Sequence, residues 1–243
     1  LAAAMAAWTL DRQVLDSRWL FGGGAAAGLL AAWLYRSARV RREFVLLAEE
    51  NAAAAIADHL RNEALDRQAT AELKRLLRLD TAPRRIEGFD ISNILGNQSV
   101  ASLVVWEDGQ AKKSDYRKFR IQTVEGANDF ASMQEAVMRR YGATEDLARP
   151  DLILIDGGLG QLSAALEGLK QVGQDQIPIM GLAKARGEKE ERIFLPGRKN
   201  PIVLRPTSPA THLVQRIRDE AHRFALTYHR NLRGKALLSS ELD

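Results

Sequence analysis

Two aspartates in this sequence have surroundings suited to metal-dependent chemistry. Asp90 lies in an apolar stretch of alternating hydrophobicity, where an isolated ionised carboxylate is costly to bury. Asp156 ends a nearly continuous apolar run, and two glycines that permit close backbone approach follow it. If the fold brings both together, they repel unless one is protonated or a cation lies between them. Oxygen ligands favour Mg²⁺ or Mn²⁺, so the pair predicts a divalent-metal site.

His222 is the histidine best placed to complete such a site. It lies within a predicted helix, and Asp219, three residues earlier, shares its face. An imidazole ligand would move the metal preference toward Mn²⁺. The residues alone leave three alternatives open. Asp156 can be a helix N-cap, Asp90 a turn former, and His222 a surface histidine paired with Asp219.

Positive charge is concentrated near the C-terminus. The chain has 35 Lys and Arg against 31 Asp and Glu, yet the stretch from Lys184 to Lys235 holds thirteen basic and five acidic residues. This asymmetry indicates a polyanionic partner, with basic side chains contacting phosphates. The candidates for DNA binding are Lys184, Arg186, Arg198, Lys199, Arg216, Arg223, His229 and Arg230.

Composition excludes several classes of protein. The 243 residues are 46% hydrophobic and 27% charged, which is typical of a globular protein and not of a disordered or polytopic membrane protein. The absence of cysteine excludes disulfides, zinc–thiolate sites and a thiol nucleophile. The uncharged segment from Trp19 to Tyr35 is shorter than the roughly twenty residues of a membrane helix and contains three consecutive glycines, so we expect no membrane partner.

The N-terminal third is Ala-rich and predicts helix, amphipathic from Arg41 to Leu79. Pro83 ends this helix, since proline cannot continue it. We therefore predict a helical segment over 1–82 and a second domain over 83–243.

The second domain predicts a mixed α/β (α+β) sheet. The expected strands are 86–92, 99–106, 116–124, 151–156, 177–183, 192–195 and 201–204, and the expected helices are 129–141, 160–172 and one that starts at Ser208-Pro209. The Asp108-Gly109 turn favours a hairpin. This order is typical of ribonuclease H-like folds, in which the first strand lies beside the fourth. Asp90 and Asp156 would then meet on adjacent strands.

Six ordered motifs together resemble one family, the C-terminal endonuclease domain of UvrC, the incision subunit of bacterial nucleotide excision repair. The similarity runs from about Arg84 to Asp243. The motifs are GFDIS at 88–92, DFASM at 129–133, IDGG at 155–158, GLAK at 181–184, LPGR at 195–198 and RDEAHRF at 218–224.

The resemblance implies a ribonuclease H-like domain that cuts DNA on the 5′ side of a lesion. Asp90, Asp156 and His222 match the family's catalytic triad, which binds a divalent metal, and Asp129 matches a further acidic position. We rank Asp129 lower because an aspartate at a helix start has an obvious capping role. Three protein ligands favour one metal ion, Mn²⁺ or Mg²⁺. The chain departs from the family at Gly88, where cysteine is common.

The implied partners are damaged double-stranded DNA and UvrB, the latter through a segment absent from this chain. The expected compartment is the cytoplasm, and we expect a piece of a longer protein that is a weak nuclease by itself. Two other classes stay open: a non-catalytic DNA or protein docking module with the same fold, and a membrane-tethered regulatory protein built around Trp19–Tyr35.

Overall fold

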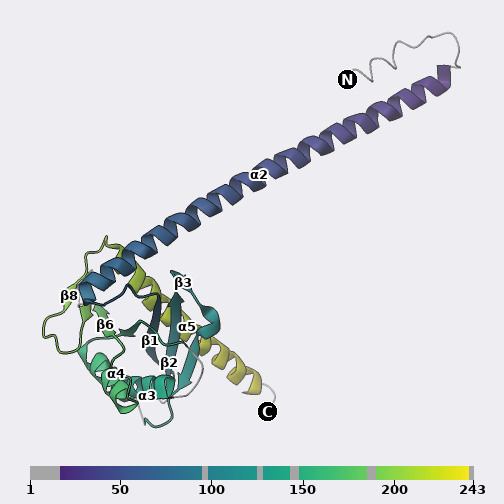
Figure 1. Ribbon diagram of the computed structural model, residues 1–243. Coiled ribbons are helices and arrows are strands. Elements are labelled where there is room, and N and C mark those ends of the chain that lie inside the picture. Colours follow the sequence, from purple (N-terminus) through teal and green to yellow (C-terminus); the bar gives the residue numbers. More distant parts are fainter. Residues whose placement is uncertain (1–16, 95–97, 125–127, 143–147, 185–189, 241–243) are drawn as a thin grey trace. The chain divides into compact units, whose positions relative to one another are not determined.

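The computed structural model describes residues 17–94, 98–124, 128–142, 148–184 and 190–240, and omits the side chains of 17–27, 31, 32, 41, 93, 94, 98 and 228–240. Internal contacts divide the chain into two units, Leu1–Leu60 and Arg61–Asp243 (Figure 1). The boundary expected after residue 82 stays a prediction.

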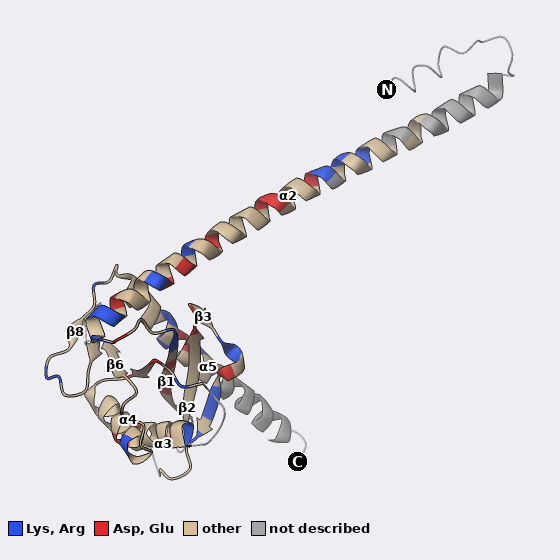
Figure 2. Cartoon of the chain, in the orientation of Figure 1, with Lys and Arg blue, Asp and Glu red and all other residues tan. Residues whose placement is uncertain are grey.

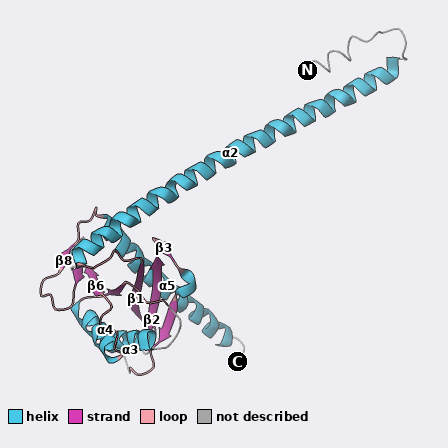
Figure 3. Ribbon diagram, viewed as in Figure 1, coloured by secondary structure: helices cyan, strands magenta, loops and turns pink. Residues whose placement is uncertain are grey.

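The N-terminal part of the chain is helical from Ser17, as expected, and residues 1–16 of the expected helical segment lie outside the described residues. One helix, α2, spans Ser17–Leu77 (Figure 3). In the first unit its apolar side chains are exposed, among them Trp33 and Phe44. In the second unit its last turns bury Ala69 and Leu73 in the core. Within the described ranges no helix is long and apolar enough to cross a membrane.

The second unit is built on a mixed eight-stranded sheet. Its order is β3-β2-β1-β5-β6-β7-β8, and β4 also pairs with β2. Strand β1 is antiparallel to β2 and parallel to β5, which confirms the expected neighbour relation. The strands are β1 (Arg85–Ile94), β2 (Gln98–Glu107), β3 (Gln110–Ala111), β4 (Arg117–Arg120), β5 (Leu152–Asp156), β6 (Ile179–Lys184), β7 (Glu191–Phe194) and β8 (Ile202–Val203).

Helices cover both faces of this sheet. The helices are η1 (Lys113–Asp115), α3 (Asp129–Gly142), α4 (Leu159–Gln171) and α5 (Pro209–Ser240). Alternate residues of a strand point to opposite faces. Phe89 of β1 therefore packs with residues of α3 and α4 in one core cluster, whereas Ile86 packs with residues of α5 and the end of α2 in the other. Ser208 caps α5, since its Oγ accepts a hydrogen bond of 3.4 Å from the Thr211 amide.

The Asp-Gly turn forms the predicted hairpin between β2 and β3. Asp108 has φ 49° and Gly109 has φ 81°, the two left-handed positions that such a turn requires. The third expected strand is shorter than predicted. The amides of Gln122 and Thr123 donate to the Glu135 carboxylate of α3 instead of continuing the strand.

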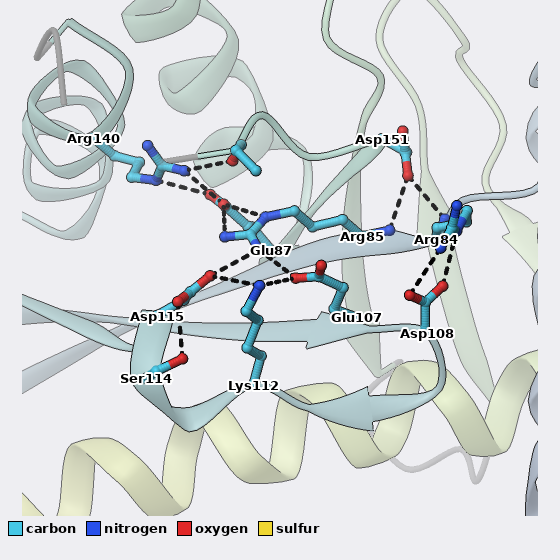
Figure 4. A network of polar contacts seen from close by, with 11 residues as sticks. Arg84, Arg85, Glu87, Glu107, Asp108, Lys112, Ser114, Asp115, Arg140 and Asp151 are labelled. Carbon is cyan, nitrogen blue, oxygen red and sulfur yellow. Dashed lines mark hydrogen bonds and ion pairs between the residues drawn. The ribbon is translucent and has the colours of Figure 1, made fainter. Parts of the chain in front are cut away.

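A buried network of ion pairs fixes the first half of β1 (Figure 4). Glu87 is fully buried and accepts hydrogen bonds from Arg140 at 2.7 and 3.0 Å and from the Tyr141 hydroxyl at 2.8 Å. Arg85 bonds to Glu107 at 2.7 Å and to Asp115 at 2.8 Å. These contacts, made three and five residues before Asp90, tie β1 to β2, η1 and α3.

Candidate active site

Strands β1 and β5 bring Asp90 and Asp156 to the same edge of the sheet. Their parallel register pairs Phe89 with Ile155, so the next residue on each strand is one of the two aspartates. Asp90 is only 6% exposed, and the Ser92 hydroxyl donates a hydrogen bond of 3.1 Å to its Oδ2. Because Asp90 lies inside β1, the turn-former alternative is wrong.

The environment of Asp156 opposes ionisation. Burial raises the pKa of Asp156 to about 6, and the charge of Asp90 adds to this effect, whereas Arg218 and His222 oppose it. The pair therefore resists being doubly ionised, and a cation between the carboxylates would relieve this repulsion. The N-cap alternative for Asp156 is wrong, because Gly158 occupies the cap position of α4.

Helix α5 crosses β1 closely enough to set His222 beside Asp90. A Cβ on Gly88 would lie 2.7 Å from Ile217 Cγ2, so a side chain there would push against α5. Five residues further along α5, His222 Nδ1 lies 3.5 Å from Asp90 Oδ2. The His222 side chain is 60% exposed, which leaves the imidazole accessible from solvent.

The alternative that pairs His222 with Asp219 is not what the structure describes. The Asp219 carboxylate accepts hydrogen bonds of 3.2 and 3.1 Å from Arg218 Nε and Nη2. His222 is turned toward the sheet edge and Asp90 instead. The helix spacing identified a possible partner for His222, but the packing of α5 on β1 selected another.

The chemistry of these three residues fits a divalent cation. Asp90 and Asp156 offer carboxylate oxygens and His222 offers an imidazole nitrogen, a donor set suited to Mn²⁺ or Mg²⁺. Within the described residues, no group of three or more such side chains already converges on one point.

Sequence reasoning missed a buried ion pair next to Asp156. Glu191, at the start of β7, is 1% exposed and accepts hydrogen bonds from Arg218 Nη1 at 2.7 Å and Gln215 Nε2 at 3.1 Å. Its Oε2 is buried and has no hydrogen-bond partner within the described residues. The negative charge of Glu191 raises the pKa of Asp156, while Arg218 lowers it. An acidic residue inside a basic stretch was the only signal in the sequence.

Asp129 is the first residue of α3, as expected, but it is not the cap. The Asn128 side chain occupies that position, because its Oδ1 accepts a hydrogen bond of 3.2 Å from the Ala131 amide. Asn128 and not Asp129 therefore occupies the N-cap position, and the role of Asp129 in the reaction stays a prediction.

The predicted DNA-binding residues lie in different surroundings. Lys184 ends β6 at the edge that also carries Asp156, and it is exposed, as are Arg198 and Lys199 in the turn before β8. Arg216 forms an ion pair with Asp66 and lies over the Trp106 ring, which favours a structural role. The remaining candidates are Arg223, which pairs with Glu220 at 2.6 Å, Arg186, which lies outside the described residues, and His229 and Arg230, whose side chains are not described.

Comparisons with a family model and with known proteins all point to the same family. A family model described as the UvrC RNAse H endonuclease domain matches residues 74–226. UvrABC system protein C of Bdellovibrio bacteriovorus is 46% identical over 212 residues, which cover 83% of this chain and 34% of that protein. UvrABC system protein C of Solibacter usitatus is 55% identical over 174 residues, which cover 70% of this chain and 27% of that protein. The chain thus spans about a third of the length of these relatives.

Solved structures with a similar arrangement are endonucleases V. One from Ciona intestinalis, in complex with inosine-containing DNA, gives a TM-score of 0.42 at 11% identity and covers 63% of this chain and 89% of that chain. Human ENDOV gives a TM-score of 0.33 at 19% identity, and the match covers 50% of this chain and 58% of that chain. The assignment therefore depends on the sequence match, and by that match the chain belongs to the UvrC RNase H endonuclease domain family.

Proposed function

We propose that this chain is the metal-dependent endonuclease domain that makes the 5′ incision beside a DNA lesion in nucleotide excision repair. The observation that carries the proposal is the meeting of Asp90 and Asp156 on adjacent parallel strands, with His222 Nδ1 3.5 Å from Asp90. A docking module would have no need to keep two carboxylates at one sheet edge, where burial and the charge of Asp90 oppose the ionisation of Asp156.

In the proposed mechanism Asp90, Asp156 and His222 would hold one divalent cation, Mn²⁺ or Mg²⁺. When bound, the cation would supply a Lewis acid that stabilises negative charge on the attacked phosphate and lowers the pKa of a water molecule. The Ser92 hydroxyl orients the Asp90 carboxylate through its hydrogen bond to Oδ2. Arg218, fixed by Glu191, keeps a positive charge near Asp156 and so favours its ionised form, which is the form that binds metal.

The partners proposed for the longer protein are damaged double-stranded DNA and UvrB, with UvrB contacted through a segment outside this chain. Relatives named UvrABC system protein C support both partners. We place the activity in the bacterial cytoplasm, because that is where the chromosome is cut and repaired.

Isothermal titration with Mn²⁺ tests the site without a lesion or a partner protein. The wild-type chain should bind about one ion, and Asp156→Asn should lose most of this binding because one of three ligands is removed. Asp175→Asn is a matched control, since Asp175 is an exposed aspartate outside the site. Unchanged binding in Asp156→Asn would refute the assignment.

The incision itself is tested in the longer protein. We expect Asp156→Asn to abolish cutting on the 5′ side of a lesion while DNA binding persists, because the substitution removes a metal ligand and no proposed DNA contact. Cutting that persisted at the wild-type rate would show that Asp156 has no part in the reaction.

A further inference from the structure

Strand β4 forms a basic margin of the sheet beside the candidate active site. It pairs only with β2 among the described strands, and three of its four residues are basic: Arg117, Lys118 and Arg120. From Tyr116 to Val124 the sequence contains no acidic residue. Figure 2 shows this concentration of Lys and Arg on the strand next to β2. We propose that β4 binds the phosphate backbone of the DNA strand that is cut, an inference that rests on the proposed endonuclease function.

The strand register places β4 at a suitable distance from the metal site. Asp90 of β1 pairs with Ser102 of β2, and Ser102 pairs with Lys118 of β4, so the three residues form one row across the sheet. Neighbouring strands lie about 4.8 Å apart, which puts the Lys118 backbone about 10 Å from that of Asp90. One strand of B-DNA rises about 3.4 Å per nucleotide, so this distance corresponds to about three nucleotides.

The side chain of Lys118 is held next to the helix that carries His222. Its Nζ lies 4.1 Å from the centre of the Phe224 ring, two residues after His222. Phe224 in turn packs edge-to-face against Tyr116, with ring centres 5.1 Å apart. The Ser102 hydroxyl also donates a hydrogen bond of 3.0 Å to a carbonyl of α5. Lys118 and the candidate metal ligands therefore lie on the same face of the sheet, and contacts with α5 hold this face in place.

The two arginines of β4 keep a positive charge that no carboxylate of the described residues balances. Arg117 Nη1 donates to the backbone carbonyls of Ser114 and Tyr116, at 2.9 and 3.0 Å. Neither Arg117 nor Arg120 forms an ion pair with a described residue. The neighbouring cations differ, because Lys112 pairs with Glu107 at 2.7 Å and Arg85 is similarly neutralised (Figure 4). Arg120 lies on the same face of the sheet as Lys118 and the candidate ligands, whereas Arg117 points to the other face of this edge strand. The charge of the two arginines along this margin of the sheet suits a row of phosphates.

The test measures DNA binding by fluorescence anisotropy as a function of salt. The chain carrying Arg117→Gln, Lys118→Gln and Arg120→Gln is titrated with a labelled DNA duplex between about 50 and 200 mM salt. Losing two or three phosphate contacts should lower the slope of log affinity against log salt by about two to three, and weaken binding about tenfold or more at the low-salt end. An unchanged slope would overturn the proposal and leave β4 as an edge strand whose charges only oppose aggregation.

Two further variants make the result specific. Lys74→Gln/Arg75→Gln/Lys170→Gln removes the same charge from exposed positions outside the site and should leave the slope unchanged. An equal loss in this control would overturn the proposal, because total charge alone would then explain binding. The exchange Arg117→Lys/Lys118→Arg/Arg120→Lys keeps the charge and should restore wild-type binding. If it binds as weakly as the glutamine variant, the charges are not the cause and the proposal fails.

Calorimetry separates this inference from the proposed function. The β4 glutamine variant should bind Mn²⁺ as the wild type does, because it keeps the three candidate ligands. Loss of Mn²⁺ binding would show that the substitutions damage the candidate active site, and it would overturn the proposal that β4 binds DNA phosphates. If the wild type itself bound no Mn²⁺ while β4 still governed DNA affinity, the nuclease proposal would fail and the DNA-binding role of the strand would remain.

Discussion

Replacing Asp156 with asparagine removes a carboxyl group whose ionisation the fold opposes. The pKa of Asp156 is about 6 in the folded protein, against 3.8 for an ordinary aspartate, because of burial and the charge of Asp90. The folded state therefore binds this proton more tightly than the unfolded state does. The resulting stability is fully present below the unfolded pKa and is lost as the pH rises through about 6. Without metal, the wild type at neutral pH carries a destabilising charge that Asp156→Asn lacks.

The size of the effect follows from the shift. One pKa unit corresponds to about 1.4 kcal/mol, so the difference between 3.8 and about 6 gives at most about 3 kcal/mol. Solvent screening of the partly exposed carboxyl reduces this to about 1–3 kcal/mol. As the pH rises from about 4 to about 8, the free energy of unfolding of Asp156→Asn should increase by this amount relative to that of the wild type.

Urea unfolding in the presence of a chelator measures this difference. Asp175→Asn serves as control and should show a constant offset from the wild type at every pH, because Asp175 is exposed. Adding Mn²⁺ should reverse the order at high pH, since only the wild type gains the binding free energy. If the two proteins differ by the same amount at both ends of the pH range, the raised pKa of Asp156 is refuted.

Three further substitutions test the parts that position the site. Gly88→Ala should lower the free energy of unfolding in urea by about 1–3 kcal/mol and weaken Mn²⁺ binding, because the added methyl group displaces α5. Gly158→Ala, with open space around its Cβ, should lower the free energy of unfolding less. Arg218→Met should cost about 2–3 kcal/mol of unfolding free energy because Glu191 stays buried without its cation, and adding Glu191→Leu should recover most of it; no recovery would contradict the pairing. Ser208→Ala should cost about 1 kcal/mol in thermal unfolding through loss of the α5 cap, and an unchanged melting temperature would exclude that role.

Local signals in the sequence determined most of the elements. The apolar run before Asp156 predicts a buried strand because parallel strands are covered on both faces, and β5 confirms it. The turn at Asp108-Gly109 needs no distant partner, since its two residues tolerate positive φ by themselves. The start of α5 after Ser208 follows equally from capping chemistry and from the fixed φ of proline.

The order of strands expected from the sequence also predicts that Asp90 and Asp156 lie on adjacent strands, because few topologies join a hairpin sheet to parallel strands. The register of β1 and β5 agrees with that expectation. What the order could not give is the approach of α5, which depends on the small volume of Gly88 beneath it.

Tertiary structure alone decided which charges are neutralised. Glu191 and Arg218 are 27 residues apart and pair only because β7 and α5 pack together. Arg216 belongs to the same basic helix, but it forms an ion pair with Asp66 of α2, so its charge is neutralised. Arg117 and Arg120 of β4 form no ion pair with a described residue, because none of the acidic side chains that the structure describes is brought close to them. Electrostatic energy depends on distance and burial, and both are set by segments far apart in the chain, so residue types and spacing cannot reveal them.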